Sequence, residues 1–167
     1  MQKLVGTEII KQLNQSNIEY VLSVPDITTS ENILKPLIKN NEIKVIQVCK
    51  EDEAISISAG LYAAGKKSVI LIQHTGLLDS INCLRAVSVE IGNPTFLLVG
   101  LLRHESGTDP NDSNRYGLKI IKPILEAMNI EYSYIDQSGD EQSITSLINK
   151  SFNACKPHIV LIGSEPQ

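Results

Sequence analysis

Short runs of Val, Ile and Leu recur along the chain, and the segments between them have apolar residues at helical spacing. The clearest runs are KVIQVC, SVILIQ, PTFLLVGLL and HIVLIG, at residues 44–49, 68–73, 94–102 and 158–163. Strands that are apolar at consecutive positions are buried on both faces, which is typical of a parallel sheet between two layers of helices. This alternation restricts the fold more than any other feature of the sequence.

Six strands alternating with helices follow from this pattern. The expected strands are residues 20–25, 44–49, 68–73, 94–102, 131–136 and 158–163. The expected helices are residues 5–17, 30–41, 51–66, 77–92, 116–130 and 141–155. Because crossovers between parallel strands are right-handed, these elements predict a doubly wound α/β fold, with a six-stranded, mostly parallel sheet and helices on both faces. Ligands of such folds bind at the carboxyl ends of the strands.

The chain of 167 residues is long enough for one compact domain, residues 1–167, and too short for two of ordinary size. Its net charge of −4 and pI near 5.4 argue against nucleic acid as a partner. No apolar run approaches the roughly 20 residues that span a bilayer, and the N-terminus lacks the features of a signal peptide. We therefore expect a cytoplasmic protein that does not bind a membrane.

The three cysteines, Cys49, Cys83 and Cys155, are odd in number, far apart and set among apolar neighbours. They are predicted to be reduced thiols in the core, and not a disulfide or zinc site. The sequence also lacks the glycine-rich nucleotide-binding patterns, a C-x-x-C pair and the H-E-x-x-H zinc motif. No metal ligands are therefore assigned to this chain.

The stretch VCKEDEAISISAGLYAAGKK, residues 48–67, places three acids before a helix that is poor in bulky side chains. Acids in a first turn complement the helix dipole, and this alone explains the charge of Glu51, Asp52 and Glu53. It does not explain the Ala, Ser and Gly residues that follow, which bury little apolar area. Such residues let another backbone or a flat ligand come close.

From Glu51 to Leu84, the sequence resembles the pyrimidine-binding domain of thiamine-diphosphate-dependent enzymes. The matching features are an acid at the head of a small-residue helix, the pattern A-G-x-x-x-A-G-K that ends it, the strand VILIQ and the turn GLLDSINCL. Within that superfamily, SVPD, TGLLDSIN and AMNIEY are most similar to the alpha subunits of sulfopyruvate decarboxylases and to the corresponding half of phosphonopyruvate decarboxylases. The resemblance extends over essentially the whole chain.

The resemblance implies a catalytic role for one acid of this helix. A glutamate accepts a hydrogen bond from N1′ of the cofactor aminopyrimidine and so promotes loss of the thiazolium C2 proton. Counting back nine positions from Gly60, as the family spacing requires, selects Glu51. Asp52 and Glu53 would then be accessory acids. Complementing the helix dipole stays the alternative role for Glu51.

The turn after the third strand is implied to line the cofactor pocket through Gln73, His74, Thr75, Gly76 and Leu77. Relatives commonly carry a glutamine-asparagine pair here, so His74 departs from the pattern. Its imidazole could bond the aminopyrimidine, assist proton transfer near neutral pH as a catalytic group, or satisfy a loop carbonyl. The sequence does not decide among these roles.

Three further residues are candidates for substrate binding. Arg103 and His104 open a long polar loop after the fourth strand, and the planar guanidinium of arginine suits a sulfonate, phosphonate or carboxylate. Asp26, in SVPD, follows the first strand. The alternatives are an exposed loop tip for the arginine and histidine, and helix capping near Thr28 and Thr29 for Asp26.

The diphosphate half of these enzymes binds magnesium through a G-D-G sequence and a downstream asparagine. The only near match here, SGDEQS, lacks the second glycine. The resemblance therefore implies a diphosphate-binding (beta) subunit that holds Mg²⁺. Thiamine diphosphate would be shared between the two chains of a hetero-oligomer.

Together these features predict the pyrimidine-domain (alpha) subunit of a two-chain, thiamine-diphosphate-dependent 2-oxoacid decarboxylase, active only with its partner. Its substrate would be an anionic 3-substituted pyruvate, 3-sulfopyruvate or 3-phosphonopyruvate, converted to the aldehyde and CO₂. The alternative is a non-catalytic binding or regulatory module on the same α/β fold, because a fold alone does not confer activity.

Overall fold

The computed structural model describes residues 2–40 and 42–167. Six parallel strands form one sheet in the order β2-β1-β3-β4-β6-β5. In chain order, the strands are β1 (Tyr20–Ser23), β2 (Lys44–Gln47), β3 (Ser68–Gln73), β4 (Phe96–Gly100), β5 (Glu131–Ile135) and β6 (His158–Ile162).

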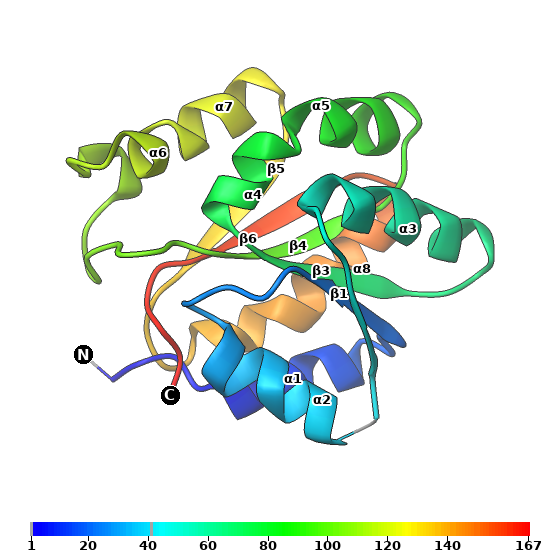
Figure 1. The fold of residues 1–167 in the computed structure, drawn as a ribbon, viewed down its shortest axis with the longest axis horizontal. Coiled ribbons are helices and arrows are strands. Elements are labelled where there is room, and N and C mark those ends of the chain that lie inside the picture. The colour runs from blue at the N-terminus through cyan, green and yellow to red at the C-terminus, as the bar shows by residue number, and fades with distance from the viewer. Residues whose placement is uncertain (1, 41) are drawn as a thin grey trace.

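Helices cover both faces of this sheet (Figure 1). One face is covered by α1 (Gly6–Gln15), the π-helical segment η1 (Ser30–Leu34), α2 (Lys35–Asn40) and α8 (Ile144–Ala154). The other face is covered by α3 (Glu51–Ala63), α4 (His74–Asp79), α5 (Ile81–Cys83), the π-helical segment η2 (Leu84–Glu90), α6 (Tyr116–Lys119) and α7 (Ile121–Ala127). Two 3₁₀ turns complete the chain, η3 (Pro110–Asp112) and η4 (Asp140–Ser143). None of the helices described is both long and apolar enough to cross a membrane.

The consecutive apolar residues of the central strands supply two separate cores, because successive strand residues point to opposite faces. Phe96 and Leu98 of β4 pack in the core beneath α1 and α8, whereas Leu97 and Val99 pack in the core beneath α3 to α7. Every residue of β4 and β6 is buried. Each such large apolar side chain contributes roughly 1.5–3 kcal/mol by its burial.

The order of the strands reverses beside β1. The chain passes from β1 outward to β2 at one edge, then returns to β3 on the other side of β1 and continues toward the opposite edge. The ends of β1 and β3, at Ser23 and Gln73, are therefore neighbours at the switch point where ligands of such sheets bind. The predicted doubly wound α/β fold is confirmed, with a sheet that is parallel throughout.

Several helical regions differ from the sequence prediction. The helix expected at residues 77–92 is divided among α4, α5 and η2, and the helix expected at residues 30–41 begins as the π-helical segment η1. Helix α4 begins at His74, directly after β3, so residues 74–76 are helical and do not form a turn. The single helix expected at residues 116–130 is broken at Ile120 into α6 and α7. The break is expected near Pro123, which lacks an N–H and whose ring crowds the carbonyl group four residues earlier.

The prediction that the cysteines lie in the core is wrong. Cys49 and Cys155 are exposed, Cys83 is half-buried, and all three are free thiols. Cys49 lies just before α3, and Cys155 ends α8 in the left-handed conformation with φ 51°. Both exposed cysteines thus lie at the ends of helices, where the chain runs along the surface.

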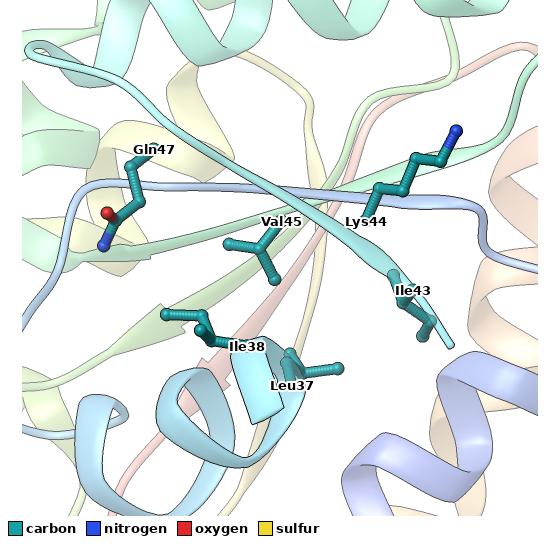
Figure 2. A pocket seen from close by; sticks show the side chains of 6 residues that line it. All are labelled: Leu37, Ile38, Ile43, Lys44, Val45 and Gln47. Carbon is teal, nitrogen blue, oxygen red and sulfur yellow. The ribbon is translucent and has the colours of Figure 1, made fainter. Parts of the chain in front are cut away.

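A hollow of about 260 Å³ lies along the open edge of the sheet at β2 (Figure 2). Leu37 and Ile38 of α2 face Ile43 and Val45 across it. Among the described residues that line it, Lys44 is the only titratable one. None of the predicted site residues borders this hollow, so it is separate from the candidate site.

Candidate cofactor and substrate site

The three acids at the head of α3 have three different environments. The Glu53 carboxylate caps the helix, since its Oε2 accepts from the backbone N–H of Cys49 at 3.1 Å and of Lys50 at 3.2 Å. Asp52 Oδ2 lies 3.8 Å from Lys50 Nζ, and its Oδ1 is buried without a hydrogen-bond partner in the part of the chain that the structure describes. Two acids thus already complement the helix N-terminus, which leaves Glu51 free for another role.

The Glu51 side chain lies against the backbone of Gly76 in the first turn of α4. A methyl group built on Gly76 would collide with Cγ, Cδ and Oε1 of Glu51, each well inside the 3.0 Å limit that real Cβ atoms essentially never cross. Only glycine admits Glu51 in this position. The carboxylate is half-buried, and no group within residues 2–40 and 42–167 donates a hydrogen bond to it. Glu51 therefore has acceptor oxygens that remain open to solvent or to a ligand.

His74 occupies the first position of α4 and is 6% exposed. Its Nδ1 accepts a hydrogen bond from the backbone N–H of Leu102 at 3.3 Å, so the neutral ring carries its proton on Nε2. Burial lowers the pKa of His74 from its ordinary value of 6.5, while the Gly100 carbonyl and the Asp26 carboxylate partly oppose this shift. Nε2 faces Gly117, where a methyl group would lie 3.6 Å away. The imidazole is therefore neutral near pH 7.

The other residues predicted to contact the cofactor differ in accessibility. Gln73 is half-buried and Thr75 exposed, and the Gln73 side-chain amide donates to Thr75 Oγ1 at 2.6 Å. Leu77 is fully buried in the core, whereas Leu78 is half-buried beside Gly117. Of the two leucines, only Leu78 has accessible surface for a ligand.

Asp26 uses its carboxylate to build the turn after β1. Oδ1 accepts from the backbone N–H of Thr28 at 2.6 Å and of Thr29 at 2.9 Å, and Oδ2 accepts from the Thr29 hydroxyl. The turn packs on Gly100 at the end of β4, where a methyl group would lie 2.8 Å from Thr28 Cβ. Asp26 thus stabilises the turn that precedes η1, and it does so at the same end of the sheet as His74.

His104 is held between the loop after β4 and strand β5. Its Nε2 lies 3.2 Å from the carbonyl oxygen of Thr108 and 3.0 Å from the hydroxyl of Tyr134. Because a carbonyl oxygen only accepts, Nε2 carries the proton and Nδ1 of the neutral ring is an acceptor. That Nδ1 is buried and has no partner among the described residues. Burial raises the pKa of Tyr134, and the nearby Asp136 carboxylate adds to the rise, so the phenol stays protonated.

Arg103 projects from the long loop between β4 and α6, where its φ of 59° is unusual for a residue other than glycine. It lines a groove of about 400 Å³ to which Arg115, at the other end of the loop, also contributes. Arg115 was not predicted from the sequence, because the loop has no periodicity that relates its two ends. The available signal was a second arginine placed directly before a helix.

The structure thus brings Asp26, His74, His104 and Arg103 to the carboxyl ends of β1, β3 and β4, and Glu51 joins them through its contact with α4. The set contains an unpartnered carboxylate, a neutral imidazole and a guanidinium group. It suits a heterocycle with a hydrogen-bond donor together with an anion. Over the described ranges, no group of three or more His, Cys, Asp or Glu side chains could hold a metal ion.

Residues 4–106, more than half of the chain, match the family described as "Thiamine pyrophosphate enzyme, N-terminal TPP binding domain". The chain belongs to this family. The match includes the head of α3, all of α4 and the start of the loop after β4. The resemblance to the pyrimidine-binding domain of thiamine-diphosphate-dependent enzymes is therefore confirmed, and thiamine diphosphate is the cofactor that the family binds.

The curated relatives are sulfopyruvate decarboxylases. The chain is 37% identical over 91 residues to sulfopyruvate decarboxylase subunit alpha of Methanocaldococcus jannaschii, covering 54% of this chain and 53% of that protein. It is 28% identical over 157 residues to sulfopyruvate decarboxylase of Methanosarcina acetivorans, covering 93% of this chain and 39% of that protein. It is 29% identical over 125 residues to sulfopyruvate decarboxylase subunit alpha of Methanococcus maripaludis, covering 74% of this chain and 72% of that protein. The similarity thus spans about half of the first of these relatives and less of the second.

Proposed function

We propose that this chain is the pyrimidine-domain (alpha) subunit of a two-chain, thiamine-diphosphate-dependent 2-oxoacid decarboxylase. The family supports the cofactor, and the names of the relatives support an alpha subunit and a sulfopyruvate substrate. The observation that carries the proposal is the Glu51 carboxylate, seated on Gly76 and left without a donor by the described residues. The aminopyrimidine N1′ is a partner of the kind that this carboxylate lacks.

Thiamine diphosphate, when bound, supplies the electron sink that decarboxylation of a 2-oxoacid requires. Glu51 would accept a hydrogen bond at the aminopyrimidine N1′, and the neutral His74 would donate or relay a proton through Nε2 on the side of α6. Gln73 and Thr75 would line the pocket by hydrogen bonding. Gly76 would allow close approach and Leu77 would support α4 from the core.

The proposed substrate is a 2-oxoacid with a distal anion, in the first place 3-sulfopyruvate, which would yield an aldehyde and CO₂. Arg103 would bind the distal anion through charge-assisted hydrogen bonds. His104, held by Thr108 and Tyr134, would fix the loop that carries Arg103 in the substrate site, and Asp26 would shape the facing turn. 3-Phosphonopyruvate is the related substrate against which this preference is tested.

The diphosphate and Mg²⁺ would be held by a beta subunit, because this chain lacks the G-D-G sequence that binds them in the family. The cofactor would then lie across the interface of a hetero-oligomer, for which we propose a cytoplasmic location. The neighbouring reading frame is the first place to look for such a partner. The isolated chain, given cofactor and Mg²⁺, should not decarboxylate; substantial turnover by it would refute the divided site.

Replacing Glu51 by glutamine tests the carrying observation, because the shape is kept while the carboxylate is removed. In the reconstituted complex, Glu51→Gln should lower kcat by roughly 10²- to 10⁴-fold, the range for loss of a general acid-base contribution. Exchange of the thiazolium C2 proton with deuterium, followed by NMR, should slow as well. This second measurement reports on cofactor activation without substrate.

Glu53→Gln is the matched control, since Glu53 is the same residue type two positions along the same helix. It should weaken the cap of α3 and lower stability by roughly 0.5–2 kcal/mol, with kcat almost unchanged. Full activity of Glu51→Gln would contradict the catalytic role. It would favour the alternative function, a non-catalytic binding or regulatory module on the same fold.

A further inference from the structure

The loop that connects β4 to α6 can be followed in Figure 1. Its residues line a groove of about 400 Å³. Arg103 lines it from one end of the loop and Arg115 from the other, and both arginines are exposed. Glu105 and Asp112 line the same groove. Two guanidinium groups gathered from the ends of one loop make this groove a candidate anion site.

The protein does not neutralise either of these guanidinium groups. Within the described ranges, Arg103 and Arg115 make no ion pair within 4.0 Å and donate no side-chain hydrogen bond. The third arginine of the sequence, Arg85, instead pairs with Glu90 and donates to Asn82. The two arginines of the groove therefore retain their donors for a ligand.

The loop backbone orients both arginines. Arg103 is held in the left-handed conformation, and the His104 N–H bonds to the Leu101 carbonyl at 3.1 Å to close the turn around it. At the other end, Ser113 Oγ accepts from the backbone N–H of Arg115 at 3.1 Å. Residues other than glycine persist in this conformation where the surrounding structure imposes it, and they cluster at functional sites.

The groove also borders the proposed reaction centre. Leu102, next to Arg103, donates its backbone N–H to His74 Nδ1 at 3.3 Å. Gly117, two residues after Arg115, faces Nε2 of His74. A Cβ atom built on this glycine would lie 3.6 Å from Nε2. Each arginine is thus within two residues of a backbone position that touches His74. A substrate that reacts beside this histidine can place its distal group in the groove.

We infer that Arg103 and Arg115 together bind the distal anion of the substrate, and that Arg115 determines specificity. The inference rests on the proposed function and adds to it a second arginine and a preference among anions. Glu105 and Asp112 bring two negative charges to the same groove, and their repulsion grows with each charge that the distal group carries. A sulfonate carries one negative charge, whereas a phosphonate carries more than one near neutral pH. The groove therefore favours 3-sulfopyruvate over 3-phosphonopyruvate.

The test compares arginine variants in the complex reconstituted with the beta subunit. Arg115→Ala should lower kcat/KM for 3-sulfopyruvate by about ten- to hundredfold, as expected for loss of a charge-assisted hydrogen bond, and Arg103→Ala should do the same. Neither should change kcat/KM for pyruvate, which has no distal anion, by more than about twofold. Arg115→Lys keeps the charge without the planar fork and should give an intermediate loss. Arg85→Ala is the matched control and should affect neither substrate.

Binding of 3-sulfopropionate gives a measurement that is independent of turnover, because this anion lacks the keto group. By isothermal titration calorimetry, its Kd should rise about tenfold or more in Arg115→Ala and stay unchanged in Arg85→Ala. Glu105→Gln should raise kcat/KM for 3-phosphonopyruvate more than for 3-sulfopyruvate. The reason is that the second charge of the phosphonate feels the removed repulsion most.

The outcomes separate the two proposals. A wild-type complex that decarboxylates no 2-oxoacid would refute the proposed function itself. If the wild type acts on 3-sulfopyruvate but Arg115→Ala slows both acids alike, or neither, then Arg115 does not belong to an anion site. Equal effects of Glu105→Gln on the sulfonate and the phosphonate would overturn the stated preference.

Discussion

Replacing Gly76 by alanine should disable the proposed site without unfolding the chain. The added methyl group would overlap Cγ, Cδ and Oε1 of Glu51 by about an ångström relative to ordinary contacts of 3.4–4 Å. Because Glu51 is half-buried, its side chain can turn toward solvent and leave the position beside α4. A misplacement of about 1 Å in a catalytic group can lower the rate about 10²-fold, equivalent to about 2.7 kcal/mol of transition-state stabilisation.

The assay measures kcat and thiazolium C2 exchange in the complex, and thermal unfolding of the chain alone. Alanine is favoured over glycine inside a helix by roughly 0.5–1 kcal/mol, so the unfolding free energy of Gly76→Ala should stay within about 1 kcal/mol of wild type. Gly60→Ala is the control for stability, because a methyl group on Gly60 of α3 meets no atom within 4 Å. Unchanged kcat and exchange in Gly76→Ala would refute the reasoning that Gly76 positions Glu51.

Three further outcomes follow from packing, titration and exposure. Gly100→Ala should lower the unfolding free energy by about 1–3 kcal/mol in urea titrations, because its methyl group would crowd the turn after β1. Burial lowers the pKa of both His74 and His158, so below about pH 6.5 the unfolded chain binds more protons than the folded chain, and the unfolding free energy decreases as the pH is lowered. His74→Gln should reduce the slope of unfolding free energy against pH, and an unchanged slope would contradict this. Cys49 and Cys155 are exposed and should react with a thiol reagent in the native chain, whereas thiols that react only after unfolding would contradict the structure.

The fold was predictable because its signal is local. A strand buried on both faces, such as β6, must be apolar at every position, and that requirement can be read without knowing its neighbours. The start of α4 could not be read in this way. The residues QHTG show no helical periodicity and no Ser, Asp or Asn cap, and His74 becomes helical through contacts with the loop after β4.

The site was predictable only where family spacing supplied what local patterns do not. Glu51 was selected by its distance from Gly60, but its contact with Gly76 depends on how α3 and α4 pack at the ends of two strands that are not adjacent in the sheet. Arg115 was missed for a similar reason, since a loop without periodicity gives no sign that its two ends border one groove. Asp26 bonds near Thr28 and Thr29, where a helix cap was the alternative, but it forms a turn, because Asx side chains commonly bond backbone groups two or three residues later.

The separate environments of the acids at the head of α3 have a genetic consequence if the proposed function holds. Helix capping depends on Glu53, so a chain altered only at Glu51 keeps the contacts that start the helix. Such a chain should fold and still recruit the beta subunit. In a cell that carries both alleles, it would occupy partner subunits in proportion to its expression and lower the total activity in that proportion.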